Sequence, residues 1–440
     1  FFHFLIDNLP CRVTIYRESE PLVSGALHRT ALMCCFDVDF STWEGRDACH
    51  ADTKTLLESI VYDQGRIETV AEYRIEHDLL GNREVPSAAY YGVQTVRALE
   101  NFQVSNIPIS HYPELIRALG YIKKACALAN YECKTLDKKI VDAIIKASDE
   151  VIAGKFDDQF PIDAVQGGAG TSTNMNANEV IANRALEHLG KKKGEYKFAH
   201  PNTHVNMSQS TNDVYPTSLR LATAWMLDQL VDEVDYLQKA LKAKSVEFAD
   251  ILKMGRTQLQ DAVPMTLGQE FAAYSAMIEE EIEKIRRVQT QLYTINMGAT
   301  AIGTGITAPK GYDKIVTRHL AELTGLPLVL APNLVKATQD AGDFVEVSST
   351  VKRLAIKTSK ICNDLRLLSS GPRTGIAEIK LPPKQPGSSI MPGKVNPVIP
   401  EVVNQVAFEV IGNDMTITMA AEAGQLELNV MEPMLAFKLF

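Results

Sequence analysis

Apolar residues recur at steps of three and four along three long stretches from residue 217 onward. Within the first stretch, Leu219, Ala222, Met226 and Leu230 follow this spacing, which is the period of an α-helix with one apolar face. A helix of that length, at 1.5 Å per residue, extends over about 54 Å and cannot bury its stripe against a small local core. We therefore predict an all-α fold with an elongated central helix bundle, shared between subunits. The predicted long helices cover residues 217–252, 266–297 and 334–369.

Shorter helical patterns precede the bundle and predict a mostly helical N-terminal domain over residues 74–210. The last of these helices stops at Gly190, because glycine commonly follows the end of a helix. Residues 1–73 show no sustained helical period and stay an unassigned extension. The shorter predicted helices cover residues 114–132, 136–153 and 174–189.

The central bundle is expected over residues 211–440. Its first helix is predicted to open at Pro216, and a fourth helix to start near Pro400 and to be still in progress at Phe440. We therefore expect a bundle that is truncated at its end.

Composition and charge narrow the class of protein. Lys and Arg number 45 and Asp and Glu 54, which gives a net charge of −9. An acidic chain argues against a nucleic acid as partner, because such binding depends on neutralising phosphate groups. No run reaches the ~18 apolar residues of a membrane span, and the first residues do not resemble a signal peptide. Seven irregularly spaced cysteines without a Cys-x-x-Cys pair predict reduced thiols and no metal site. We expect a cytoplasmic protein that acts on small molecules.

A long Gly- and Pro-rich segment, residues 371–397, separates the last two predicted long helices. It contains GSSIMPGKVNP, which runs from Gly387 to Pro397 and offers two hydroxyls, one lysine and one amide. A loop of this length inside a compact domain is usually functional or disordered. The segment is no phosphate-binding P-loop, because Val395 stands where that motif requires a hydroxyl after the lysine.

Two polar clusters lie at predicted helix starts, and a third lies in the turn between the first two long helices. The first two are GGAGTSTNMN (Gly167–Asn176) and SQSTND (Ser208–Asp213), and the turn is GRTQLQDAVPMTLGQE (Gly255–Glu270). Helix N-termini favour anions, although Ser and Thr there also serve as plain helix caps. Arg256 and Asp261 are interpreted as a structural ion pair. Hydroxyls, amides and a single lysine together predict a pocket for a dicarboxylate.

These motifs resemble those of the aspartase/fumarase superfamily, and most closely its aspartase branch. The resemblance also includes YYGVQT (Tyr90–Thr95) and LNVMEP (Leu428–Pro433), and it extends from about Arg74 to Phe440. It implies an all-helical subunit of three domains, of which the small C-terminal domain is expected to be absent here. It also implies a homotetramer whose active sites are shared among three subunits, and no cofactor. The implied reaction is the reversible deamination of L-aspartate to fumarate and ammonia through an enediolate.

The resemblance also implies a role for each matching residue. Ser388 corresponds to the general base, and Asn212 to a residue near the substrate's amino group. The α-carboxylate site is matched by Thr257, Lys394 and Asn396. The donors around the β-carboxylate are matched by Thr171, Ser210, Thr211 and Ser389.

Two alternatives stay open at this stage. A class II fumarase shares the motifs, but the fumarases carry histidine at the position of Gln258, a residue that cannot titrate. A non-titrating side chain fits the loss of ammonia better than the loss of hydroxide, so Gln258 is only a possible site residue. The other alternative is an inactive structural homologue, against which the intact polar clusters argue.

Overall fold

The computed structural model describes residues 72–440, so most of the extension predicted for residues 1–73, with its four cysteines, lies outside them. The described chain begins with an antiparallel hairpin of strands β1 (Tyr73–Asp78) and β2 (Gly81–Pro86). A helical region follows, in which α4 packs against α5 and α5 against α6. Its helices are α3 (Val93–Asn101), α4 (Pro113–Glu132), α5 (Lys138–Ile152) and α6 (Thr171–His188).

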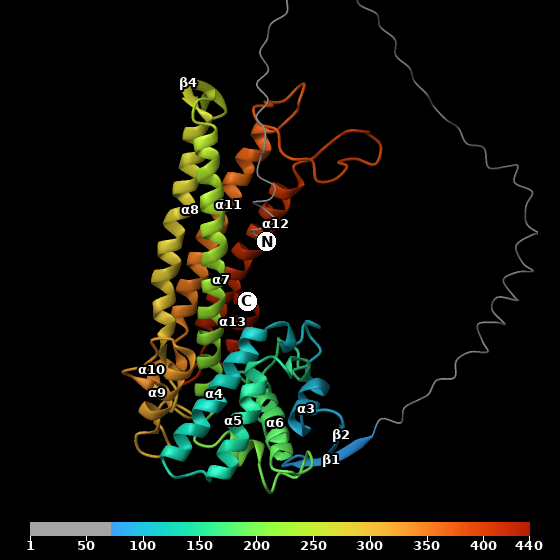
Figure 1. Cartoon of the computed structure of the whole chain (residues 1–440), viewed down its shortest axis with the longest axis vertical. Coiled ribbons are helices and arrows are strands. Elements are labelled where there is room, and N and C mark those ends of the chain that lie inside the picture. Colours follow the sequence, from blue (N-terminus) through green and yellow to red (C-terminus); the bar gives the residue numbers. More distant parts are fainter. Residues whose placement is uncertain (1–71) are drawn as a thin grey trace, which may run out of the picture. The chain divides into compact units, whose positions relative to one another are not determined.

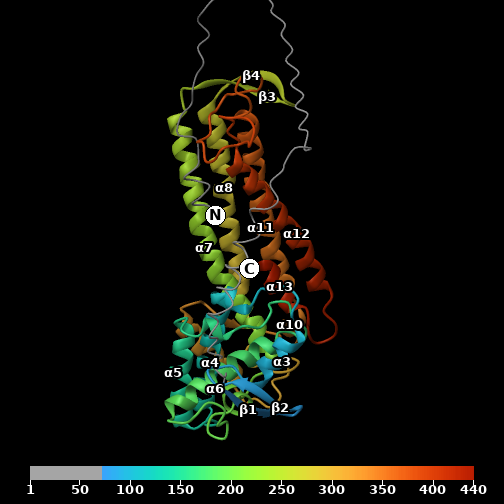
Figure 2. The same cartoon turned by 90° about the vertical axis from the view of Figure 1, so that its right-hand side faces the viewer.

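Four long helices form the bundle. They are α7 (Thr211–Glu247), α8 (Leu267–Gln289), α11 (Gly342–Leu368) and α12 (Val398–Glu422). Helix α8 packs against both α7 and α11, and α11 packs against α12, so that the four run side by side in both views (Figures 1 and 2). The predicted all-α fold with a central helix bundle is confirmed.

Short elements connect the long helices. The hairpin of β3 (Leu252–Thr257) and β4 (Gln260–Thr266) joins α7 to α8, and it turns at Gln258 and Leu259, which both have positive φ angles. Helix α13 (Glu432–Leu439) packs on α12 and α7. The remaining short elements are η1 (Ile109–His111), η2 (Asp157–Gln159), η3 (Pro201–Val205), η4 (Thr290–Tyr293), β5 (Thr294–Ile295), α9 (Tyr312–Thr324), β6 (Val329–Leu330) and α10 (Leu334–Gln339).

The predicted start of the first long helix is wrong. Helix α7 begins at Thr211, and Pro216 lies inside it instead of opening it. Ser210 caps the helix through a capping box with Asp213, and such a box is a strong helix start. The polar cluster that was expected just before the helix therefore supplies its N-cap, Ser210, and its first residues.

Three other predicted boundaries are corrected in the same way. The helix predicted to end at residue 297 ends at Gln289. The stretch 334–369 is two helices, α10 and α11, because the backbone of Asp340 is extended (φ −91°, ψ 118°) and ends α10. The Asp340 carboxylate then accepts a hydrogen bond from the amide of Gly342 (2.9 Å), the first residue of α11. The last stretch is also two helices, since Asn429 donates to the carbonyl oxygens of Ala420 and Ala421 at the end of α12.

Two kinds of feature are absent from residues 72–440. No helix in this part of the chain is long and apolar enough to cross a membrane, and no three His, Cys, Asp or Glu side chains there are grouped as metal ligands would be. The described cysteines, Cys126, Cys133 and Cys362, are free thiols, and two of them are buried.

Candidate active site

The first group of predicted site residues lies at the N-terminal ends of α6 and α7. Thr171 is the exposed first residue of α6 and follows Gly170, which has a φ of +84°. A Cβ at Gly170 would lie 2.4 Å from Cδ2 of Tyr215, so only glycine allows this close approach. The contact sets where α6 begins next to α7.

Ser210 and Asn212 use only part of their hydrogen-bonding capacity within the fold. The Ser210 hydroxyl oxygen accepts from the Asn212 amide (3.2 Å), so its role as a helix cap is confirmed. The Asn212 side chain donates from Nδ2 to the carbonyl oxygen of Ala301 (2.7 Å). That donation orients Oδ1 away from Ala301 and leaves it as an acceptor, which is what a nearby amino group requires.

A buried polar network lies beneath these helix starts. Lys123 of α4 is fully buried, and its Nζ donates to Oδ1 of Asn174 (2.6 Å), Oδ1 of Asn206 (3.0 Å) and Oε1 of Gln209 (2.8 Å). Burial lowers the pKa of Lys123 to about 7. Burial also raises the pKa of Asp213 to about 7, although its carboxylate accepts from the amides of Ser210, Gly298 and Thr300.

The second group lies in the loop between α11 and α12. Ser388 Oγ accepts hydrogen bonds from the amides of Ile390 (3.2 Å) and Met391 (3.1 Å). Two amides that donate to a hydroxyl oxygen stabilise it when it loses its proton. The geometry therefore supports an alkoxide at Ser388 better than at an ordinary exposed serine.

The base of this loop is closed by the residues around Gly387. The Gly387 amide donates to the Lys394 carbonyl oxygen (2.7 Å), and Asn396 Nδ2 donates to the Gly387 carbonyl oxygen (2.9 Å). A Cβ at Gly387 would lie 2.7 Å from the Lys394 carbonyl oxygen. The side chains of Ser389 and Lys394 are exposed, so they are free to meet a ligand from outside this chain.

Thr257 and Gln258 lie exposed at the tip of the β3–β4 hairpin. Below the tip, Arg256 pairs with Asp261 (3.6 Å), as predicted, and more closely with Glu378 (2.5 Å). Glu378, which the sequence analysis missed, therefore links the hairpin to the segment that leads into the Ser388 loop.

One chain does not bring the two groups together. Helix α7 has 37 residues, or about 55 Å at 1.5 Å per residue. Ser210 precedes its first residue, and the hairpin with Thr257 follows its last turn. Figure 1 shows the hairpin and the loop before α12 at one end of the bundle, and the start of α7 near α4 and α6 at the other.

The residues that sequence reasoning missed are mostly buried. Lys123 contacts Asn174, which is 51 positions further along the chain, and no local pattern encodes such a pair. One signal was available: Asn174, Asn176 and Asn178 all lie inside α6. Asparagine is a poor residue for a helix interior, so three of them there indicate a role in tertiary contacts.

The known proteins that this chain resembles are lyases. Residues 81–412 match a family model described as lyase. The aspartate ammonia-lyase of Pseudomonas aeruginosa is 60% identical over 372 residues, which cover 84% of this chain and 78% of that protein. The aspartate ammonia-lyase of Escherichia coli is 60% identical over 368 residues, which cover 83% of this chain and 77% of that protein.

Solved structures give the same picture of the fold. A cobalt-bound structure titled fumarate lyase:delta crystallin from Brucella melitensis has a TM-score of 0.82 and 54% identity, and it covers 84% of this chain and 80% of that chain. The class II fumarase from Schistosoma mansoni has a TM-score of 0.80 and 37% identity, with the same two shares covered.

Proposed function

The chain belongs to the aspartate ammonia-lyase family of the lyases, and we propose that it catalyses the reversible deamination of L-aspartate to fumarate and ammonia. The observation that carries this proposal is the 60% identity to aspartate ammonia-lyases over most of the chain. Gln258, which cannot titrate, makes loss of water from malate the less suitable reaction. The alternative of a class II fumarase is not favoured.

We propose that Ser388 is the general base. Its alkoxide, held by the amides of Ile390 and Met391, removes a proton from the carbon next to the β-carboxylate. The electron pair of that C–H bond moves into the carboxylate, which becomes an enediolate. The same pair then forms the C=C bond of fumarate while the C–N bond breaks, and the ammonium group leaves as neutral ammonia with the C–N pair.

The proposed β-carboxylate donors are the hydroxyls of Thr171, Ser210, Thr211 and Ser389. They act on the step that needs them most, because the carboxylate gains a second negative charge in the enediolate. Donors fixed in place before the reaction lower its barrier, and the loss of one typically costs about 10²–10³ in rate.

The remaining proposed contacts bind the other end of the substrate. Thr257, Lys394 and Asn396 hold the α-carboxylate, for which Lys394 supplies the positive charge. Asn212 Oδ1 accepts a hydrogen bond from the amino group. Gln258 is a possible further contact. In this proposal, side chains supply the general base, the hydrogen-bond donors and the positive charge, and no cofactor or metal ion takes part. We also propose that the protein is cytoplasmic.

We further propose a homotetramer in which each active site takes residues from three subunits. The separation of Ser210 from Thr257 by the length of α7 supports sharing, because one chain cannot close a site for a small substrate across about 55 Å. The proposed organisation is an N-terminal domain at residues 74–210 and a central bundle at residues 211–440.

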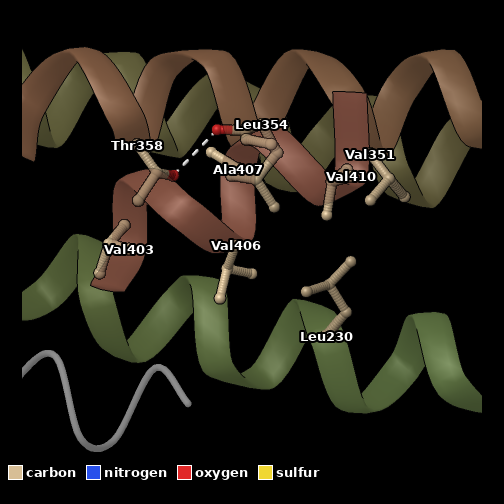
Figure 3. A pocket seen from close by; sticks show the side chains of 9 residues that line it. Leu230, Val351, Leu354, Thr358, Val403, Val406, Ala407 and Val410 are labelled. Carbon is tan, nitrogen blue, oxygen red and sulfur yellow. Dashed lines mark hydrogen bonds between the residues drawn. The ribbon is translucent and has the colours of Figure 1, made fainter. Parts of the chain in front are cut away.

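An apolar surface on the bundle supports this assembly. Phe408, Met415 and Met419 are each more than 60% exposed on α12, and their spacing puts them along one side of that helix. Next to them, an apolar groove of about 180 Å³ lies between α7, α11 and α12, and Figure 3 shows Leu230 of α7 opposite Val406 and Val410 of α12. Large exposed apolar patches are typical of protein interfaces.

The test of the reaction is an assay of the purified full chain. Fumarate is followed by its ultraviolet absorbance with L-aspartate alone and, in parallel, with L-malate alone. We expect fumarate from aspartate and none from malate. Product from malate only, or from neither substrate, overturns the proposed function.

Site sharing is tested by complementation. Thr211→Ala and Ser388→Ala affect the two separated groups, and each variant alone is expected to be nearly inactive. Mixed tetramers from co-expression contain sites in which both residues are intact, so part of the activity should return. Mixed tetramers that stay as inactive as the single variants contradict shared sites.

A further inference from the structure

The buried network beneath the site fixes the direction of its hydrogen bonds. Nζ of Lys123 donates to all three amides around it, so the oxygen atom of each amide faces Nζ. Their NH₂ groups therefore point elsewhere. Asn174 is only 1% exposed, and turning its side chain over would replace the oxygen that accepts from Lys123 Nζ with an NH₂ group.

Asn174 connects this network to a proposed site residue. Its Nδ2 donates to Oγ1 of Thr211 (3.0 Å) and to Oδ1 of Asn206 (3.2 Å). A threonine hydroxyl has one hydrogen, and Thr211 uses its oxygen to accept from Asn174. Within residues 72–440, no acceptor takes the Thr211 hydrogen, which is thus left for a group outside the described chain.

We propose that Asn174 is a positioning residue that holds the Thr211 hydroxyl as a hydrogen-bond donor toward the substrate's β-carboxylate, an inference that rests on the proposed function. A free threonine hydroxyl can rotate and donate inward or outward. When Asn174 Nδ2 donates to Thr211 Oγ1, a hydrogen of Asn174 already lies between the two side chains, so the Thr211 hydroxyl cannot point its own hydrogen inward. The hydroxyl therefore points its own hydrogen outward before the substrate arrives, and a donor fixed in advance needs no reorganisation during the reaction.

The substitution Asn174→Asp reverses this direction without changing the shape of the side chain. A carboxylate still accepts from Lys123, but it also accepts from Thr211, whose hydrogen then points inward and is lost to the substrate. Asn174→Ala only removes the donor, so Thr211 can still rotate outward. If Asn174 positions Thr211, Asn174→Asp therefore lowers kcat/KM more than Asn174→Ala does. If Asn174 only fills space, the isosteric Asn174→Asp lowers kcat/KM less than Asn174→Ala does.

The control for a buried charge is Asn178→Asp. Asn178 lies one turn further along α6, is buried, and donates to the same Asn206 oxygen (3.1 Å), but Thr211 is not among its hydrogen-bond partners. Thr211→Ala supplies a second background, in which there is no hydroxyl to position. Thermal melting of each variant reports whether the fold is intact.

The experiment measures kcat and KM for L-aspartate and, by calorimetry, the binding of fumarate to each purified full-length variant. We expect kcat/KM to fall by about 10²-fold in Asn174→Asp and by about tenfold in Asn174→Ala, with Asn178→Asp near wild type. In the Thr211→Ala background, Asn174→Asp should add no more than about twofold, because the two residues then share no interaction.

Two results overturn the inference while leaving the proposed function intact: Asn174→Asp as active as Asn174→Ala or more so, or the same added loss in the Thr211→Ala background. Fumarate binding tests the positioning separately from the chemistry, since Asn174→Asp should weaken it more than Asn174→Ala does. If the wild-type chain neither deaminates aspartate nor binds fumarate, the proposed function fails together with the inference.

Discussion

Asn296 donates from Nδ2 to the main-chain carbonyl oxygen of Asn212, at 3.0 Å. In a regular α-helix that carbonyl would accept the amide of residue 216, but residue 216 is proline and has no N–H. Asn296 therefore satisfies the acceptor that Pro216 leaves open. The same bond ties the backbone of a proposed substrate-binding residue to the chain beyond α8.

We expect Asn296→Ala to destabilise the protein and to raise KM for aspartate. The unpaired Asn212 carbonyl should cost about 1–3 kcal/mol in the free energy of unfolding, and the first turn of α7 loses its support. Denaturation and steady-state kinetics measure the two effects. Thr338→Val is the control, because it removes the other acceptor of Asn296 Nδ2 (3.2 Å) and should leave KM unchanged. Equal KM changes in both variants would contradict the role of the Asn212 contact.

The helix boundaries show which parts of the fold a sequence can predict. The period of apolar residues predicted the long helices, because it reflects a face that must be buried wherever the helix packs. The start of α7 was placed too late because Pro216 was taken as the opening residue, although the capping box of Ser210 and Asp213 is a local signal. What the sequence does not show is that a distant side chain, Asn296, donates to the carbonyl oxygen that Pro216 leaves without a donor. The end of α12 depends in the same way on Asn429, which returns to cap it from beyond the helix.

In the candidate site, too, local signals could be read from the sequence and tertiary contacts could not. The loop of Ser388 and Lys394 was singled out from its motif, since glycine, proline and hydroxyl residues in one segment are a local signal, and their proposed roles came from the family resemblance. The two amides that donate to Ser388, and the contact between Arg256 and Glu378, depend on how the loop folds and where it meets the hairpin. Lys123 and Asn174 needed the structure, because a buried lysine is encoded only by the partners that surround it.

Ser388→Ala should nearly abolish deamination without unfolding the chain. Loss of a general base typically lowers the rate by about 10²–10⁴-fold, and the Ser388 side chain lies partly exposed in a loop. We expect the loss in kcat, with little change in KM. Ser389→Ala is the matched neighbour: as a proposed carboxylate donor, Ser389 should change KM as well as kcat. Normal turnover by Ser388→Ala would exclude Ser388 as the base.

Gly387→Ala should inactivate the enzyme through the backbone. The added Cβ would lie 2.7 Å from the Lys394 carbonyl oxygen and 2.9 Å from Cγ of Asn396, so the base of the loop must open. Because the loop is largely exposed, we expect the melting temperature to stay near that of the wild type while kcat/KM falls by about 10²-fold or more. A variant with wild-type kcat/KM would show that the loop base does not set the position of Ser388.

The pH dependence of stability should report on Glu179. Its buried carboxyl accepts hydrogen bonds from the amides of Gly92, Gln94 and Thr95. Burial, together with the charge of Glu76, raises its pKa from 4.5 to about 7. The folded state binds this proton more tightly than the unfolded state does. The contribution of the protonated Glu179 carboxyl to stability is therefore fully present below pH 4.5 and is lost as the pH rises to about 7.

Glu179→Gln removes this titration and is therefore the test. The glutamine variant should be less stable than the wild type at every pH, since its NH₂ group faces backbone donors that then lack an acceptor. The difference in unfolding free energy between the two proteins should shrink as the pH rises from 4.5 to about 7. Denaturation at pH 4.5 and at about pH 7 measures this difference. A difference that widens with pH would show that the folded state favours the ionised carboxyl instead.

Charge on the exposed side of α12 should dissociate the proposed tetramer. In Met415→Glu, a carboxylate replaces an apolar side chain that is 63% exposed in the single chain, and burying it in an interface without a partner is costly. We expect smaller species in analytical ultracentrifugation and, because each site needs residues from several subunits, a parallel loss of activity. Lys146→Glu, an exposed position on α5, is the control and should change neither property. A monomer that keeps full activity would contradict shared sites, and a Met415→Glu protein that stays tetrameric would place the interface elsewhere.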